Sequence, residues 1–285
     1  MTTLRKTKTI SNMIIQKDLS GLFFWFKRSN LIKILEAILF LTILLLAWEL
    51  IITKFNIPKR IIPKPTDLLN FLQQEFLNSK STTVLTKSIF SFKDALIGFS
   101  LSLLIGTGIG ITLSKSKILD AILFPFLFFT QIVPVPALAP VLAAILGYGQ
   151  TTKIFLIVLF TIFPIAVIIK NAILNIPENY TLLLHTYTRK RFAIFKHLIL
   201  PSLVPPLLSV MKIVATSSIV ATIITELPLS VKNGIGKDIY NSFNNQLIPR
   251  VWVSVIIISI ISLLFFNCIS FFEKYITSKY KYGQY

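Results

Sequence analysis

The sequence predicts an all-α polytopic membrane protein with about six transmembrane helices. Of its 285 residues, 54% are apolar and only 14% are charged, whereas soluble domains carry roughly 25% charged residues. The mean hydropathy is +0.77. A helix needs about 20 apolar residues to cross the hydrocarbon core, and the chain offers six stretches of about that length. They are residues 31–52, 92–113, 118–147, 153–173, 203–227 and 250–271.

The strong positive charge fits a membrane protein better than a nucleic-acid-binding one. The formal net charge is +18, and basic loops of membrane proteins face anionic lipid on the cytoplasmic side. We therefore expect contact with membrane lipid and no nucleic acid. A modest excess of lysine and arginine in alternate connectors favours cytoplasmic N- and C-termini. The predicted organisation is a basic tail over 1–30, a transmembrane domain over 31–275 and a tail over 276–285.

The connector over residues 53–89 contains a predicted helix of its own. Thr66 has the residue type of an N-cap, and Leu68, Leu69, Leu72 and Phe76 follow on one face. We expect this helix to lie on the outer leaflet.

The third stretch is interrupted by Pro134, Pro136 and Pro140. Each proline lacks an amide donor and disturbs a helix. Non-helical backbone at membrane depth is tolerated where it is buried in protein or lines a watery cavity. The three prolines are therefore candidates for lining a translocation path, and packed kinks are the alternative.

Few ionisable residues fall near the membrane interior. Glu226 lies at the end of the fifth stretch, where an acid faces a cavity, a partner or the interface. It is either a gate or packing anchor, or an interfacial acid within reach of water or of Lys232. We expect Lys93 and Asp94 to lie at the end of a span.

We interpret the glycines and the cysteine in the spans as packing residues. Gly106, Gly108 and Gly110 allow close approach of a second helix. The single cysteine, Cys268, lies in an apolar run and reads as a small buried side chain.

The segment from Pro177 to Pro201 is too polar for a bilayer, and it has a basic, amphipathic pattern. It holds Arg189, Lys190 and Arg191, and its apolar residues recur at helical spacing. We expect a short helix or a pair of helices here that docks on a partner. A basic interfacial segment held by anionic lipid is the alternative.

No nucleotide-binding, catalytic or metal-binding motif is recognisable in the sequence. It lacks a phosphate-binding G-x-x-x-x-G-K-[ST] motif, and neither a Ser/His/Asp set nor a metal-ligand spacing is evident. We therefore expect no catalytic residue, no metal and no cofactor on this chain.

A series of short motifs then carries a family resemblance over residues 55–275. The motifs, in order, are Ile62-Pro63-Lys64-Pro65, Ser88 with Gly98-Phe99, the three glycines 106, 108 and 110, Pro125, Ile132-Val133-Pro134-Val135-Pro136-Ala137-Leu138-Ala139-Pro140, Gly147-Tyr148-Gly149 with Lys153, Phe163-Pro164, Leu198-Ile199-Leu200-Pro201, Glu226-Leu227 and Gly234-Ile235-Gly236. In this order they resemble the permease subunits of bacterial ATP-binding-cassette (ABC) importers of the nitrate, sulfonate and taurine branch.

The resemblance implies a type I ABC importer permease in the bacterial inner (plasma) membrane. The partners implied are a cytoplasmic ABC ATPase that binds ATP, an extracytoplasmic substrate-binding protein and a second copy of the chain. A self-contained secondary transporter or channel, or a protein that no longer transports, remains an alternative.

The resemblance also marks an ATPase-coupling loop within residues 177–201. The family signature is Glu-Ala-Ala, three residues, Gly, nine residues and Ile-x-Leu-Pro. Its back half is present, whereas Leu182, Leu183 and Leu184 occupy the Glu-Ala-Ala positions. Thr188 replaces the glycine, so we expect the turn between the two coupling helices to form less easily. The coupling residues expected on this basis are Glu178, Thr188, Arg189, Lys190, Arg191, Leu198, Leu200 and Pro201.

Overall fold

The chain is mainly helical in the part that the computed structural model describes, which is residues 30–77, 83–188, 190–227 and 233–280. It forms two compact units, residues 1–67 and 68–285. The first unit contains α2 (Asn30–Lys54) and the start of α3 (Pro65–Leu77). The predicted tail over 1–30 falls almost entirely outside the described residues. The all-α prediction is confirmed.

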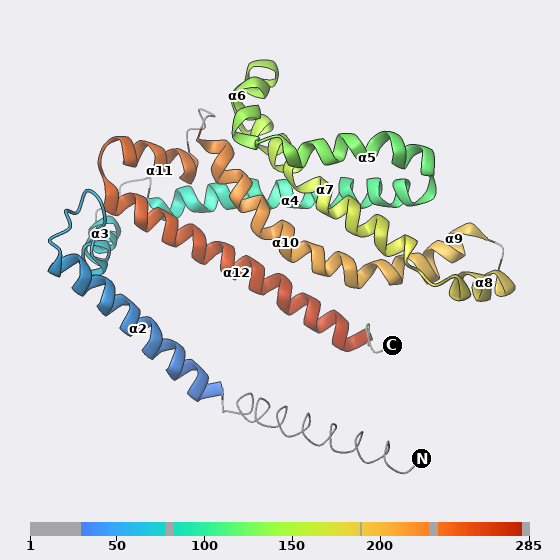
Figure 1. Cartoon of the computed structure of the whole chain (residues 1–285), viewed down its shortest axis with the longest axis horizontal. Helices are drawn as coiled ribbons and strands as arrows, with labels where there is room; N and C mark the ends of the chain where they lie inside the picture. Colours follow the sequence, from blue (N-terminus) through green and yellow to red (C-terminus); the bar gives the residue numbers. More distant parts are fainter. Residues whose placement is uncertain (1–29, 78–82, 189, 228–232, 281–285) are drawn as a thin grey trace, which may run out of the picture. The chain divides into compact units, whose positions relative to one another are not determined.

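The second unit is built from long helices joined by short connections (Figure 1). They are α4 (Val84–Lys115), α5 (Lys117–Ile132), α6 (Val135–Leu146), α7 (Gln150–Leu174), α8 (Glu178–Tyr187), α9 (Arg191–Ile194), the π-helix η1 (Phe195–Ile199), α10 (Leu200–Glu226), α11 (Ile235–Asn244) and α12 (Ile248–Tyr280).

Five helical segments of the described chain are long and apolar enough to cross a membrane, or six if α5 and α6 together form one bent span. The angle between these two helices is 114°. Their break falls at Val133 and Pro134, where proline cannot donate the next helical hydrogen bond. The predicted interruption of the third stretch is therefore confirmed.

Helices α4, α7 and α10 form the centre of the second unit. Every fourth residue of α4 from 98 to 110 is a glycine or a serine and faces α7. The stripe consists of Gly98, Ser102, Gly106 and Gly110. A Cβ atom on Gly110 would lie 2.7 Å from the carbonyl oxygen of Ala166. The close approach predicted for Gly106 and Gly110 is thus confirmed, whereas Gly108 faces open space.

A hydroxyl pair lies within this stripe. Ser102 Oγ and Thr161 Oγ1 are 2.6 Å apart, and both side chains are fully buried. Small residues and hydroxyl hydrogen bonds are the usual means by which helices associate in a membrane, where lipid offers no hydrophobic driving force. The α4–α7 contact therefore has the character of a membrane helix interface.

The two ends of this bundle differ. Helix α11 lies where α4 begins and α10 ends, whereas α8 and α9 lie where α7 ends and α10 begins (Figure 1). We call these the α11 end and the α8 end.

In the first unit, α3 begins one residue before the predicted cap. Its first residue is Pro65, so Thr66 is not the N-cap. Instead, Thr66 Oγ1 donates a hydrogen bond to Glu49 Oε1 at 2.9 Å. Burial raises the pKa of Asp67, but hydrogen bonds from the Lys59 side chain and the Lys64 backbone hold that pKa below its ordinary value.

The stripe yields a matched pair of substitutions. We expect Gly110→Ala to destabilise the protein by about 1–3 kcal/mol, because the new methyl group meets a backbone oxygen that cannot move aside. Gly108→Ala introduces its methyl group into open space and should stay within about 1 kcal/mol of the native chain. Thermal melting of both variants in detergent checks this; equal melting temperatures would contradict the stripe's role.

Candidate functional site

A buried cluster of charges lies at the α11 end. Lys153, in the first turn of α7, is 1% exposed, and Glu226, the last residue of α10, is 0% exposed. Lys153 Nζ lies 2.8 Å from Glu226 Oε1 and also pairs with Asp94 Oδ2 of α4. Gln150 Nε2 donates to the other oxygen of Asp94 at 2.6 Å.

Glu226 also binds α4 and α11. Ser91 Oγ donates to its Oε1 at 2.7 Å, and the Gly236 backbone N–H donates to its Oε2 at 2.7 Å. The same Ser91 oxygen accepts a hydrogen bond from the Ile235 N–H at 2.9 Å. A Cβ atom on Gly236 would lie 2.5 Å from the carbonyl oxygen of Ile223. Gly236 is therefore required because its backbone touches α10 directly.

A buried charge is stable only when it is paired and hydrogen-bonded, because desolvation costs several kcal/mol per ion. Here one lysine stands between two carboxylates, and backbone and side-chain donors satisfy the remaining oxygens. We call the set Ser91, Asp94, Gln150, Lys153, Glu226 and Gly236 the buried network. It fastens α4, α7, α10 and α11 to one another at one end of the bundle.

A second, partly buried set of charges lies at the same end. Asp238 of α11 pairs with Lys87 of α4 and accepts from Arg250 Nε of α12 at 2.9 Å. Glu75 of α3 accepts from the Val84 N–H at 2.8 Å, and its Oε1 lies 3.8 Å from Arg250. The charges on α3, α4, α11 and α12 thus neutralise one another.

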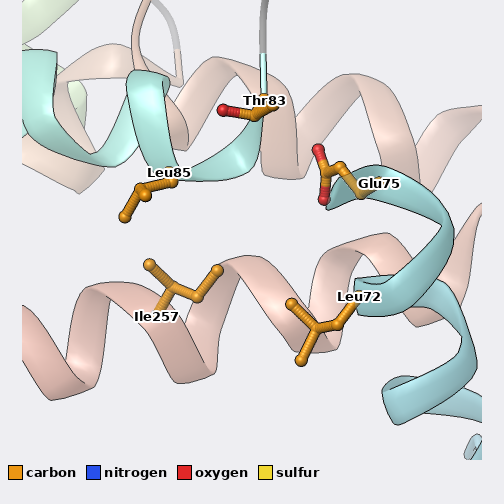
Figure 2. A pocket seen from close by; sticks show the side chains of 5 residues that line it. All are labelled: Leu72, Glu75, Thr83, Leu85 and Ile257. Carbon is orange, nitrogen blue, oxygen red and sulfur yellow. The ribbon is translucent and has the colours of Figure 1, made fainter. Parts of the chain in front are cut away.

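A small pocket adjoins this second set. Figure 2 shows Leu72 and Glu75 of α3, Leu85 of α4 and Ile257 of α12 converging on it, with Thr83 at the rim. Its walls are mainly apolar, and Glu75 is already bound by α4. The pocket is therefore a packing gap between helices and not a reactive centre.

Sequence reasoning missed the role of two of the three ionisable members of the buried network, and it did not single out Ser91 or Gln150. Asp94 was expected at a span end, but α4 begins at Val84 and places Asp94 about three turns inside the helix; that expectation is wrong. Lys153 was noted only as part of a motif. The available signal was the presence of two acids and one lysine in three different apolar segments, because charged residues there are costly unless they pair.

The path candidates are placed as follows. Glu226 is fully buried beside Lys153, which rules out the water-exposed interfacial reading; Lys232 lies outside the described residues. Pro134 caps α6 and Pro136 lies in its first turn, whereas Pro140 lies inside it. The role of all four in a translocation path stays a prediction.

The segment 177–201 forms two helical pieces, α8 and α9, with Thr188 between them. Thr188 has φ −155° and ψ 139°. This is ordinary extended backbone that needs no glycine, so the expectation of a hindered turn is wrong. Thr188 Oγ1 also accepts from the Lys190 N–H at 3.2 Å. Arg189 lies outside the described residues.

The second of these helical pieces, α9, continues through η1 into α10. Residues Arg191–Glu226 form one helical segment of 36 residues. Its only widened turn is η1, just before Pro201, which lacks the amide that would bond to the carbonyl four residues earlier. Leu198, Leu200 and Pro201 therefore lie on the helix that leads to Glu226.

The described chain offers no group of three His, Cys, Asp or Glu side chains positioned to hold a metal ion. Cys268 is exposed on α12, so the expectation that it is buried is wrong.

Lys153 offers a direct measure of the buried network. We expect Lys153→Met to destabilise the protein by about 3–5 kcal/mol, because it leaves buried carboxylates without their cation. Lys93→Met removes the exposed lysine next to Asp94 and should change stability by no more than about 0.5 kcal/mol. Thermal melting in detergent compares the two variants, and similar losses for both would contradict the assignment.

Comparison with known proteins identifies the family to which this architecture belongs. Residues 83–282 match the family described as binding-protein-dependent transport system inner membrane component. The chain is 25% identical to a probable ABC transporter permease protein of Haemophilus influenzae, over 87% of this chain and 99% of the relative. It is 24% identical to the nitrate import permease protein NrtB of Synechocystis sp., over 85% of this chain and 89% of the relative.

The fold is also similar to a solved chain of the MetNI methionine ABC transporter in an inward-facing conformation. The TM-score is 0.59 at 15% identity, and the match covers 68% of this chain and 96% of that chain. This is the architecture of a type I ABC importer permease. With a family match that spans most of the second unit, the chain belongs to the binding-protein-dependent inner-membrane components and is a multi-pass permease subunit of an ABC importer.

Proposed function

We propose that this permease works as a pair of identical chains, with a separate cytoplasmic ABC ATPase bound at the α8 end and an external binding protein at the α11 end. ATP is hydrolysed on the partner chain. The observation that carries the proposal is the group of exposed apolar side chains on α8 and α9. Helix α9 also continues into α10 as one helical segment. The orientation follows from the positive-inside bias, with both termini in the cytoplasm.

The coupling surface has the composition of a docking site. Tyr187 is 82% exposed and Phe192 is 75% exposed, and Leu182 and Leu183 lie open beside them. Exposed apolar patches of this kind mark interaction sites, and aromatic side chains dominate the energetics of interfaces. Lipid contact is the alternative for this segment, and the experiment below distinguishes the two.

Two features support transmission of movement along α10. Ile194 of α9 is buried, so the coupling helix is anchored to the bundle. From there the helix runs unbroken to Glu226 in the buried network. A displacement of α9 would therefore move α10 as a rigid helix and reach the opposite end of the bundle. ATP drives transport only to the extent that it binds the two conformations with different affinity.

The solute is a small one of the nitrate, sulfonate or taurine type, or a vitamin precursor. The nitrate permease among the relatives supports this range. Pro134, Pro136 and Pro140 mark the bent α5–α6 pair, where backbone carbonyls freed by proline can face the path. Membership of the binding-protein-dependent family argues against a self-contained secondary transporter or channel.

Removal of the exposed aromatics tests the docking surface. We expect Tyr187→Ala/Phe192→Ala to lower co-purification of the ATPase at least tenfold, since each interface aromatic contributes about 2 kcal/mol or more. Phe243→Ala, an exposed aromatic at the α11 end, is the matched control and should leave co-purification unchanged.

A second variant separates charge from apolar contact. Lys190→Glu/Arg191→Glu reverses two exposed cations of the same segment, and we expect it to weaken ATPase association without changing thermal melting. If the ATPase co-purifies undiminished with both double variants, the segment serves as a lipid anchor instead.

A further inference from the structure

The open side of α10 carries three polar residues along its middle, and the apolar residues Ile213 and Val220 are exposed on the same helix. The side of α10 that packs against the bundle carries Val210 and Val214, both fully buried. The opposite side carries Ser209, which is exposed, and Lys212 and Thr216, which are partly exposed. At spacings of three and four residues these three side chains share one helical face.

Lys212 lies well inside the span. It is about 18 Å from the start of α10 and about 21 Å from Glu226 at its end, at 1.5 Å per residue. Its neighbours Val210 and Val214 belong to the central apolar cluster with Ile165 and Ile169 of α7. The lysine is therefore at a depth where lipid would surround any open side chain.

A carboxylate on α12 holds this lysine. Lys212 Nζ lies 2.6 Å from Glu273 Oε2, and Ser209 Oγ donates to Glu273 Oε1 at 3.2 Å. Both carboxylate oxygens are thus engaged, whereas a lysine ammonium carries three donors. The Lys212 side chain remains 27% exposed, so donors are left on its open side.

The neighbouring helix faces are different. The open side of α12 is mainly apolar and suited to lipid, although Asn267 is exposed there too; it carries Leu263, Leu264, Phe271 and Phe272, together with Cys268. An ion pair that is open to hydrocarbon is costly, so ionisable residues at this depth face a water-filled cavity or a partner. The partly exposed Lys212–Glu273 pair therefore assigns this part of α10 to water, whereas the exposed aromatic side chains assign the open side of α12 to lipid.

We propose that Lys212, with the hydroxyls of Ser209 and Thr216, contacts the solute on the translocation path and selects a small anion. Glu273 acts as a positioning residue that holds the lysine in the path. This inference rests on the proposed function and narrows its substrate class. The ion pair is neutral overall, but its positive end lies on α10 one turn from Thr216, whereas the carboxylate belongs to α12. The remaining donors of the ammonium therefore favour an anion over a cation at this face.

Thiol labelling tests the site without knowledge of the solute. The protein, in its complex with the ATPase and reconstituted in liposomes, carries Cys268→Ser and Thr216→Cys. It is treated with sulfonatoethyl methanethiosulfonate, an anion, and with trimethylammonioethyl methanethiosulfonate, a cation, with and without Mg-ATP. Native Cys268, in the unaltered chain, is the control on the lipid-facing side and should react with neither reagent.

We expect the thiol at position 216 to react with the anion about tenfold faster than with the cation, after correction for their rates with free thiol. Adding Lys212→Arg should keep this preference. Adding Lys212→Gln/Glu273→Gln should abolish it, and this double change leaves no lone carboxylate in the membrane that could unfold the protein.

Two outcomes overturn the inference. If position 216 is unreactive toward both reagents in both nucleotide conditions, the face packs against lipid or protein and does not line the path. Equal rates for the two reagents mean that water reaches the face but Lys212 selects no charge. Retention of the ATPase in the same preparations reports separately on the proposed function.

Discussion

The structure depends on one buried lysine that pairs with two carboxylates at the α11 end of the bundle. Lys153 reaches Asp94 on α4 and Glu226 on α10, and the backbone of α11 closes over Glu226. The lysine is the essential member, because its removal leaves both carboxylates buried without a cation. The buried network therefore fixes the relative positions of four helices more strictly than apolar packing, which tolerates sliding.

The two ends of the bundle consequently have opposite characters. The α11 end is closed, with its charges paired inward in two sets. The α8 end presents aromatic and basic side chains outward. Helix α10 joins these ends and carries the polar face between them. In the proposed function, force enters at the α8 end and α10 transmits it to the buried network as one continuous helical segment.

Apolar stretches alone were enough to predict the all-α class and the approximate spans, because a membrane helix satisfies its own backbone. The start of α4 was placed eight residues late, since Lys87, Ser88 and Ser91 read as a polar connector. Their polarity is used inside the fold, where they meet Asp238, a backbone carbonyl and Glu226. Charged residues in apolar segments indicated that each needs a partner, but the pairing itself was not predictable, because the members of the buried network become neighbours only through tertiary packing.

The glycine and serine stripe on α4 has a mechanical consequence. Over four turns the backbone of α4 lies directly against α7, and a hydroxyl pair lies in the middle of the contact. Neither helix can slide or rotate past the other without a clash. The pair must therefore move as one rigid beam, so spectroscopic distances between labels on α4 and α7 would stay constant through the transport cycle. Helix α5 is tied to the same beam near both of its ends, because Asp120 pairs with Lys170 of α7 at 2.5 Å and Gln131 Nε2 donates to the Phe160 carbonyl oxygen at 2.9 Å.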